Sequence, residues 1–168
     1  MTRSETRFTT DRLTLRSWRV SDADDFARLH ANPETMGDYR GPLDRATSDK
    51  KLKDYIAQYD AHGFIRWRVA TLSGDFLGYV GLYPNGDDHP LGAHGDIGWR
   101  FLRSAWGQGY ATEAARATLQ HAFEHNGLSE ILAYTQVENT ASQAVIARLG
   151  LHRDTSRDFS IDDKFLNV

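Results

Sequence analysis

Two glycines at the start of a long helical segment constrain the fold of this chain more than any other feature. In "SAWGQGYATEAARATLQHAFEHNG" (104–127), Gly107 and Gly109 precede apolar residues that recur at helical spacing, and 94–103 before them has the pattern of a strand. The first turn of a helix has unpaired N–H groups and a partial positive charge, and glycine lets a ligand approach the backbone closely. A strand, a glycine turn and a helix in this order predict an anion-binding loop.

Hydrophobic patterns predict the elements on either side of this loop. Alternation over Arg12–Arg19 indicates a strand, and Ser21–Asp24 ("SDAD") has the form of a capping box that begins a helix. A second helix is expected from Thr47 to Gly63. We expect further strands over 64–72, 76–83, 94–103, 131–137 and from 151 onward, with helices over 110–126 and 139–149. The order β-α-α-β-β-β-α-β-α-β, with an antiparallel meander at its centre, predicts a mixed α/β fold and one domain over 1–168.

The composition narrows the function. The 168 residues include no cysteine, which excludes disulfides and thiolate metal sites and fits a reducing cytoplasm. No segment has the apolar length of a signal peptide or a membrane span, so we expect a soluble, cytoplasmic protein without a membrane partner. The net charge of −3 comes without a basic stripe, so nucleic acid is not expected as a partner either. The composition therefore favours small molecules as binding partners.

Two nucleotide-binding motifs compete for the glycine loop. The Walker A pattern fails because no G-K-[ST] follows. The dinucleotide pattern G-x-G-x-x-G matches at Gly107 and Gly109 but has Thr112 in the third place, and it lies four residues after the strand. Glu130 stands at a suitable distance for a ribose carboxylate, so a dinucleotide-binding domain remains an alternative.

A third interpretation is a family resemblance. The order "IGWRFLRSA", "WGQGYATEA" and, about 30 residues later, "ENTASQAVIARLGL" resembles the GNAT acyltransferases. Within them the chain looks most like the RimJ/RimL branch, which acetylates ribosomal protein N-termini. The resemblance extends from "TDRLTLR" through "NPETM" and "FLGYVGL" to "RLGL". It implies a GNAT fold and an N-acetyltransferase that moves an acetyl group from acetyl-CoA to an amine by direct attack.

The resemblance also implies which residues hold acetyl-CoA. The diphosphate would bind backbone amides of the glycine loop, where Trp106 replaces the long polar side chain usual in the broad family. The strand before the loop would pair with the pantetheine arm as an added strand, and Asn139 would bind a pantetheine amide. The expected cofactor-binding residues are Phe101, Leu102, Gly107, Gln108, Gly109, Tyr110, Ala111, Thr112 and Asn139.

Transfer to an amine needs a base, donors for an oxyanion and a proton for the leaving thiolate. Asp96, and after it His94, are the expected acid-base groups, although Asp96 also suits a solvated strand end. Ile146 stands where the broad family has a tyrosine that protonates the thiolate, so the resemblance assigns this role to Ser142. Asn139 is equally suited to cap a helix. The missing phenol leaves a non-catalytic acyl-CoA-binding module as an alternative.

One motif suggests a metal. "HAFEH" (121–125) matches the H-x-x-E-H pattern of a zinc peptidase, with His121 and His125 on one helical face. The two histidines fall away from the apolar stripe, so we expect an exposed helix face and no metal. Arg100, Arg103 and Arg148 are candidates to meet the 3′-phosphate of the cofactor.

The acceptor amine is not specified by the sequence. The resemblance implies that the walls of the acceptor site come from the first two helices, the loop between them (Pro33–Ser48) and the loop "PNGDDHPLG" (84–92). The acceptor could be a protein N-terminus, a polyamine, an amino acid or an antibiotic. The segment 153–168 is polar and short for the strand that closes this fold, so we expect it to be truncated, disordered or exchanged with a partner. A monomer and a homodimer both remain open.

Overall fold

The computed structural model describes residues 2–38, 41–162 and 164–168. Short 3-10 helices lie at Val20–Asp22, Arg103–Ala105 and Thr155–Arg157. The strands and helices are, in chain order, β1 (Arg7–Thr9), β2 (Leu13–Arg16), α1 (Ala23–Ala31), α2 (Arg45–His62), β3 (Arg66–Thr71), β4 (Phe76–Asn85), β5 (His94–Phe101), α3 (Tyr110–His125), β6 (Thr135–Gln136), α4 (Thr140–Arg148), β7 (Phe159–Ile161) and β8 (Lys164–Asn167). Among the described residues, no helix has the length and apolarity needed to cross a bilayer.

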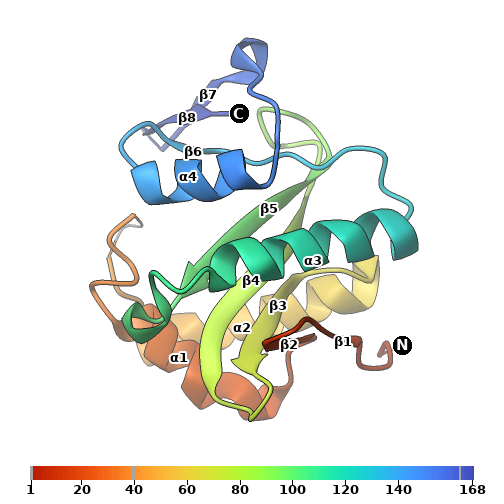
Figure 1. Ribbon diagram of the computed structural model, residues 1–168, viewed down its shortest axis with the longest axis vertical. Coiled ribbons are helices and arrows are strands. Elements are labelled where there is room, and N and C mark those ends of the chain that lie inside the picture. Colours follow the sequence, from red (N-terminus) through yellow and green to blue (C-terminus); the bar gives the residue numbers. More distant parts are fainter. Residues whose placement is uncertain (1, 39–40, 163) are drawn as a thin grey trace.

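Five strands form an antiparallel sheet in the order β1-β2-β3-β4-β5 (Figure 1). The predicted meander of three strands is therefore confirmed, with β4 and β5 paired from Gly78 opposite Phe101 to Asn85 opposite His94. A dinucleotide fingerprint belongs to a doubly wound parallel sheet. Because every pairing in this sheet is antiparallel, the dinucleotide alternative is wrong.

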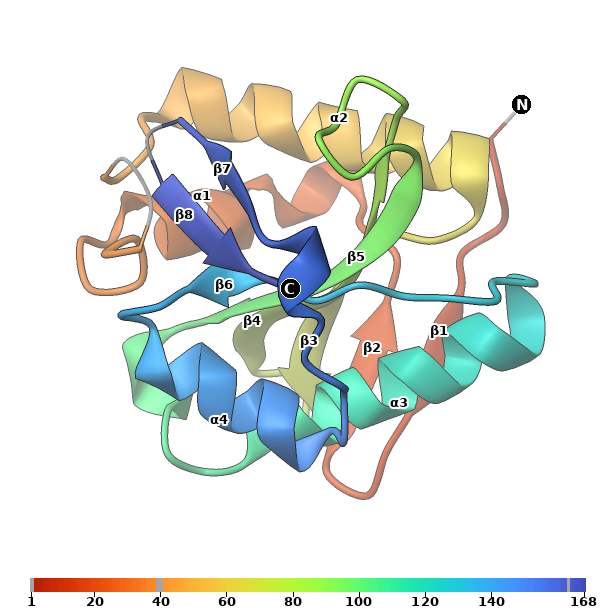
Figure 2. The ribbon, with the colours of Figure 1, turned by 90° about the horizontal axis from the view of Figure 1, so that it is seen from above.

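The sheet lies between two layers of helices. All seven residues of Phe76–Leu82 in β4 are buried, as expected for a strand covered on both faces. Figure 2 shows α1 and α2 on one face of the sheet and α3 on the other, with α4 beside α3. The predicted mixed α/β architecture is thus confirmed. The core joins these layers through Leu13, Leu15, Phe26, Leu29, Tyr55, Ile65, Trp67, Val69, Val80, Leu82, Ile97, Ala114 and Ala115.

Local signals located α2 more accurately than α1. The Asp44 carboxylate accepts from the Thr47 amide (2.7 Å), and Gly63 ends α2 with a φ of 79°. The capping box expected at Ser21 is wrong, because Ser21 lies within a 3-10 helix. A capping box is present two residues earlier, where the Asp22 carboxylate accepts from Arg19 N at 2.8 Å. The same carboxylate also binds the Arg16 guanidinium at 2.7 Å.

The first strand also differs from the expectation. Instead of one strand over Arg12–Arg19, β2 is limited to Leu13–Arg16 and pairs with β1, which the alternation did not predict. The short strand keeps Leu13 and Leu15 fully buried against the helices.

The C-terminal part forms a separate sheet of three strands in the order β6-β8-β7. The strand expected over 131–137 is wrong in extent, because this segment makes one parallel bridge, Leu132 to Asp96, and then pairs only Thr135–Gln136 with β8. The strand expected from Leu151 begins instead at Phe159. Disorder or exchange of 153–168 is likewise wrong for its described residues, because β8 pairs with β6 and β7 of the same chain. Residue 163 lies outside the described residues.

Candidate active site

The separation of β5 from β6 creates the candidate site. Ile97 N donates to the Leu132 carbonyl at 2.8 Å, and Leu132 N donates to the Gly95 carbonyl at 3.0 Å. Beyond this point β6 leaves β5 and pairs with β8. Backbone groups of alternate strand residues point to the same edge, so the N–H and C=O groups of Trp99 and Phe101 face the gap. The edge of β5 can therefore pair with an extended ligand.

The glycine loop is at the end of this gap. Gly107 and Gly109 have φ angles of 73° and 79°, in the left-handed region that other residues rarely adopt. The first hydrogen bond of α3 runs from Glu113 N to the Gly109 carbonyl (3.1 Å). The amides of Tyr110, Ala111 and Thr112 precede that bond, so they are available to an anion at the positive end of the helix dipole.

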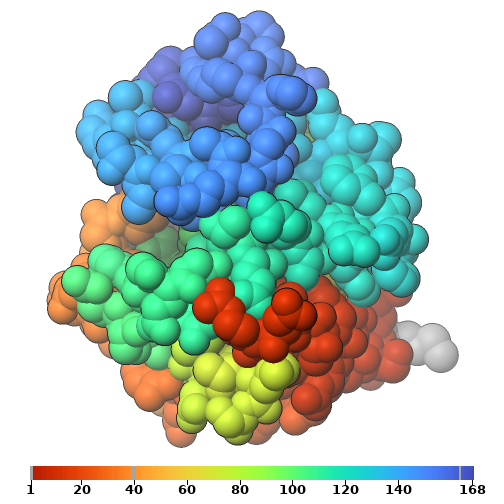
Figure 3. Space-filling model, viewed as in Figure 1, coloured from red at the N-terminus to blue at the C-terminus, as the bar shows by residue number. Residues whose placement is uncertain are grey.

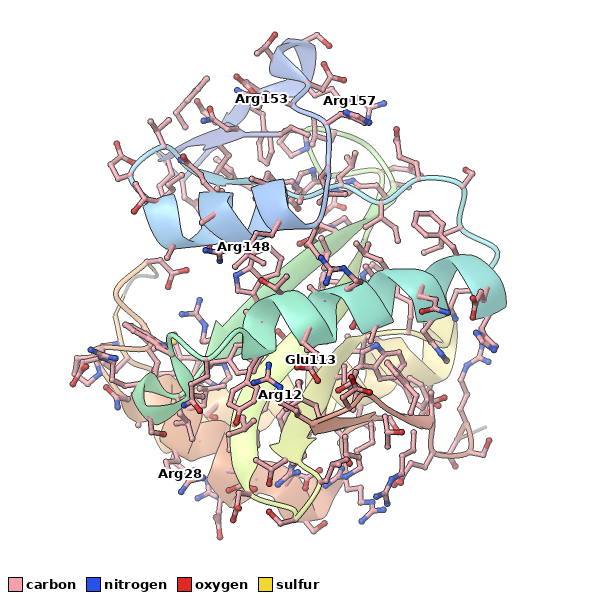
Figure 4. The ribbon with its side chains drawn as sticks, viewed as in Figure 1. Arg12, Arg28, Glu113, Arg148, Arg153 and Arg157 are labelled. Carbon is pink, nitrogen blue, oxygen red and sulfur yellow. The ribbon has the colours of Figure 1, made fainter. Side chains whose placement is uncertain are left out.

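Arg12 binds two groups at the start of α3. Its Nη1 donates to the Gln108 carbonyl at 3.0 Å, and its guanidinium binds the Glu113 carboxylate at 2.5 Å (Figure 4). Burial of Glu113 opposes its charge, but hydrogen bonds from Thr10 and Arg12 outweigh that effect and lower its pKa. The turn between β1 and β2 is thus joined to α3, distant in sequence, at the loop that would bind an anion.

The start of α4 faces the same space. The Asn139 side-chain oxygen accepts from Ser142 N at 3.1 Å and so caps the helix. Both residues line the cleft with the backbone elements above. The cleft has a volume of about 1430 Å³, and Figure 3 shows it as a hollow between α4 and the loop before α3. A nucleotide with an extended arm fits a cleft of this size.

Most of the expected site residues line this cleft, and three do not. Those that line it are Phe101, Gly107, Gly109, Tyr110, Ala111, Thr112, Asn139 and Ser142. Leu102 turns its amide to the Leu77 carbonyl of the neighbouring strand (2.8 Å). Gln108 uses its side-chain amide on the Ser104 carbonyl (2.9 Å). Asp96 is not among the lining residues, for the reason given next.

Asp96 is held in a buried polar cluster and is not a solvated strand end. Its carboxylate binds Arg66 Nη2 and Asn85 Nδ2, each at 2.7 Å, and the residue is 5% exposed. Burial works against the Arg66 charge, but the carboxylate beside it more than compensates and raises the Arg66 pKa. His94, the second acid-base candidate, contacts Asn85 at 3.4 Å in the same cluster.

Three residues at or beside the cleft have contacts that the sequence analysis did not predict. The exposed indole of Trp106 donates to the Phe101 carbonyl at 2.9 Å, so it occupies a group that an extended ligand would use. Arg100, expected to meet a phosphate, instead binds the Asp38 carboxylate at 2.6 Å. Burial would raise the pKa of Tyr79, but the charges of Arg100, Lys51 and Arg66 outweigh it and lower that pKa to about 8. Only the tertiary structure brings these groups together, so no local pattern could have revealed them.

The remaining cations and histidines have other surroundings. Arg103 binds Glu34 at 3.3 Å, whereas Arg148 lines the cleft on α4. His121 stacks on Phe8 with ring centroids 4.4 Å apart, so the expectation of a wholly exposed histidine face is wrong. Among the described residues, no three potential metal ligands stand together.

Comparison with known proteins identifies the class. The family model described as an acetyltransferase (GNAT) domain matches residues 12–152. The chain is also 30% identical to the uncharacterized protein YkkB of Bacillus subtilis (strain 168) over 151 residues, which cover 89% of this chain and 87% of YkkB. This protein belongs to the GNAT acetyltransferase family. It is therefore an acyltransferase, and acetyl-CoA is its cosubstrate.

Two further known proteins are similar to this chain. The FsC-acetyl coenzyme A-N(2)-transacetylase of Aspergillus fumigatus (strain ATCC MYA-4609 / CBS 101355 / FGSC A1100 / Af293) is 40% identical over 93 residues, covering 53% of this chain and 39% of that protein. The structure of RimL, a ribosomal L7/L12 alpha-N-protein acetyltransferase, in complex with coenzyme A has a TM-score of 0.79. The matched residues are 15% identical and cover 96% of this chain and 95% of RimL. At that identity it shows a common fold and does not identify the RimJ/RimL branch.

Proposed function

We propose that this protein transfers the acetyl group of acetyl-CoA to a primary amine by direct attack in a ternary complex. One observation carries the proposal: the open edge of β5 and the amides at the start of α3 line one cleft, opposite the start of α4. The pantetheine arm needs the first of these surfaces, the diphosphate the second and the thioester the third.

Each surface has its own part in binding. The backbone groups of Trp99 and Phe101 pair with the pantetheine arm as an added strand. The amides of Tyr110–Thr112 bind the diphosphate. Arg148 is a candidate for the 3′-phosphate because it lines the same cleft.

Ser142 is the proposed proton donor to the leaving thiolate. Its main-chain amide is used by the Asn139 cap, which fixes the first turn of α4 and leaves the hydroxyl to the cleft. Ile146 cannot take this role because its side chain has no acidic proton to donate. Asp96 is buried on Arg66, so we propose that it orients the polar cluster beside the cleft rather than touching the amine.

The acceptor class follows from amine chemistry and from the relatives. The name of the Aspergillus fumigatus relative places its acetyl group on an N(2) nitrogen, and RimL is named for a protein α-amine. We propose a primary amine of a peptide N-terminus or a small molecule, in a RimJ/RimL-like enzyme. One domain over 1–168, a cytoplasmic location and a monomer or homodimer complete the proposal.

A thiol-release screen tests it. Purified protein with acetyl-CoA is offered Ser-Ala-type N-terminal peptides, polyamines, amino acids and aminoglycosides, and both free thiol and acetylated amine are measured. We expect one amine class to give both products in equal amounts. Thermal stabilisation by acetyl-CoA without acetylation of any amine would instead support the non-catalytic acyl-CoA-binding alternative.

A further inference from the structure

A second pocket of about 320 Å³ adjoins the cleft, and its wall includes a tyrosine that contacts two histidines behind it. The pocket and the cleft share Asp38, Gln136 and Asn139. Tyr134, which precedes β6, lines the second pocket but not the cleft. Its hydroxyl lies 3.4 Å from His94 Nε2 and 3.3 Å from His89 Nε2. A phenol at the pocket wall is therefore flanked by two imidazoles.

Backbone groups fix the tautomer of each imidazole. Leu91 N donates to His89 Nδ1 at 3.1 Å, so Nδ1 bears the lone pair and the neutral ring carries its proton on Nε2. His94 Nδ1 faces the Gly92 carbonyl at 2.7 Å, which can only accept. Nδ1 of His94 therefore carries the proton, and its Nε2 is the acceptor.

These tautomers give the hydrogen bonds a direction. His89 Nε2–H donates to the Tyr134 hydroxyl, and the Tyr134 hydroxyl donates to His94 Nε2. Asn85 Nδ2 also reaches His94 Nε2 at 3.4 Å while it donates to Asp96 at 2.7 Å. A proton that arrives at the phenol oxygen can therefore be passed on to His94 in one step.

We propose that Tyr134 takes a proton from the acceptor amine in the second pocket and passes its own hydroxyl proton to His94 Nε2. This inference rests on the proposed amine acetylation, because it assigns the second pocket to the acceptor. Tyr134 is then a catalytic residue that touches the substrate. His94 acts through Tyr134 and returns the proton to solvent.

The proton count closes over one turnover. The ammonium loses one N–H proton to the Tyr134 oxygen, and the tyrosine proton moves to His94. The neutral amine then forms its C–N bond at the thioester carbon, and the C–S bond breaks. The second amine proton goes to the leaving thiolate, so the products are the amide, the free thiol and one proton from His94.

The surroundings keep the phenol of Tyr134 neutral. Burial and the Asp96 carboxylate both raise the pKa of Tyr134, so it stays protonated and carries protons without ionising. Burial and the neighbouring His94 lower the pKa of His89, which keeps it as the neutral donor. Asp96, Arg66 and Asp88 are the charged groups that face these rings, and Phe159 covers His89 and Tyr134 from β7.

Nitrogen NMR tests the direction of the hydrogen bonds between His89, Tyr134 and His94 without any substrate. In ¹⁵N-histidine protein at neutral pH, we expect His94 in the Nδ1–H form and His89 in the Nε2–H form. The Tyr134→Phe variant should change the Nε2 shifts of both rings. Opposite tautomers, or unchanged shifts in Tyr134→Phe, would overturn the directional chain whether or not the protein acetylates amines.

Enzyme kinetics then test the catalytic role of Tyr134. With an amine found by the thiol-release screen, Tyr134→Phe should lower kcat by about 100-fold, as expected for loss of general acid-base transfer, and leave acetyl-CoA affinity unchanged. His94→Gln still accepts a hydrogen bond but cannot hold the proton, so it should lower kcat and change the pH profile of kcat. His125→Gln, on an exposed part of α3, is the control for histidine loss. Wild-type kcat and an unaltered pH profile in both variants would refute the relay while the acetyltransferase function stands.

Discussion

The Arg66 guanidinium lies 2.7 Å from the Asp96 carboxylate, and the two side chains are only 22% and 8% exposed. The two residues come from strands that are not paired with each other, since β4 lies between β3 and β5. This ion pair stabilises the polar cluster beside the cleft. It also explains why Asp96, a natural base candidate by sequence, does not face the thioester space.

Asp96→Asn should therefore unfold at lower denaturant concentration than the wild type. It leaves the Arg66 charge buried without its partner, and removing one member of a buried ion pair costs about 3 kcal/mol. Urea unfolding followed by circular dichroism measures the difference. The double variant Arg66→Met with Asp96→Leu should recover much of the loss, whereas a free base at Asp96 would give a stable variant that is slow only in turnover.

Gly109→Ala should weaken acetyl-CoA binding by about tenfold. A φ of 79° strains any residue with a Cβ by about 1–2 kcal/mol, and relaxation of the loop would turn the α3 amides away from the diphosphate. Isothermal titration with acetyl-CoA measures the change. Gly127→Ala is the matched control, because Gly127 has a φ of 63° and open space around it at the far end of the same helix. Equal affinity in the two variants would contradict the binding role of the Gly109 loop.

Acetyl-CoA should change the fluorescence of Trp106. The indole now donates to the Phe101 carbonyl, and pairing of the pantetheine arm with β5 must displace it. Trp106 is 46% exposed and lines the cleft with Trp99, whereas Trp18 and Trp67 are buried, so Trp106 and Trp99 are expected to contribute the change. Trp106→Phe should bind acetyl-CoA at least as tightly and lose the Trp106 part of the signal, leaving that of Trp99. An undiminished signal in that variant would mean that the arm does not displace Trp106.

Ser142→Ala should slow acetyl transfer by about 100-fold, because the thiolate would leave without its proton donor. Its acetyl-CoA dissociation constant should remain that of the wild type. Single-turnover thiol release and calorimetry separate the two effects. Ser160→Ala, an exposed serine of β7, is the control, and full activity in Ser142→Ala would remove this residue from the chemistry.

Acid should destabilise the fold through His30. Burial, and then the positive charge of Lys51, lower the pKa of this fully buried imidazole from 6.5 to about 4. Between these values the unfolded chain binds more protons than the folded one, so stability is present above about pH 6.5 and is lost as pH falls through 4. The loss attributable to His30 is about 3 kcal/mol between pH 7 and pH 4. His30→Leu should show a correspondingly flatter pH dependence in urea unfolding, and an unchanged slope would assign the effect to other groups.

Local patterns predicted the elements whose signals lie within a few residues. Gly107 and Gly109 marked a turn that needs positive φ, and Gly63 marked the end of α2, because such backbone angles depend on the residue itself. The spacing from that turn to Asn139 also supported the family resemblance, which the family model confirms. The non-local parts were less well predicted. Neither the extra strand β1 nor the hairpin of β7 and β8 could be inferred, because a strand needs a partner that its own alternation does not specify.

The sequence by itself determined the layered α/β fold and the helix start that can hold an anion, since helical spacing and glycine φ angles are properties of short segments. Only the tertiary structure decided which side chains share a space. It buried Asp96 on Arg66, which lies thirty residues earlier, and it placed Tyr134 between His89 of the loop between β4 and β5 and His94 at the start of β5. Such contacts depend on where β6 leaves β5, and that separation follows from the competing pairing with β8.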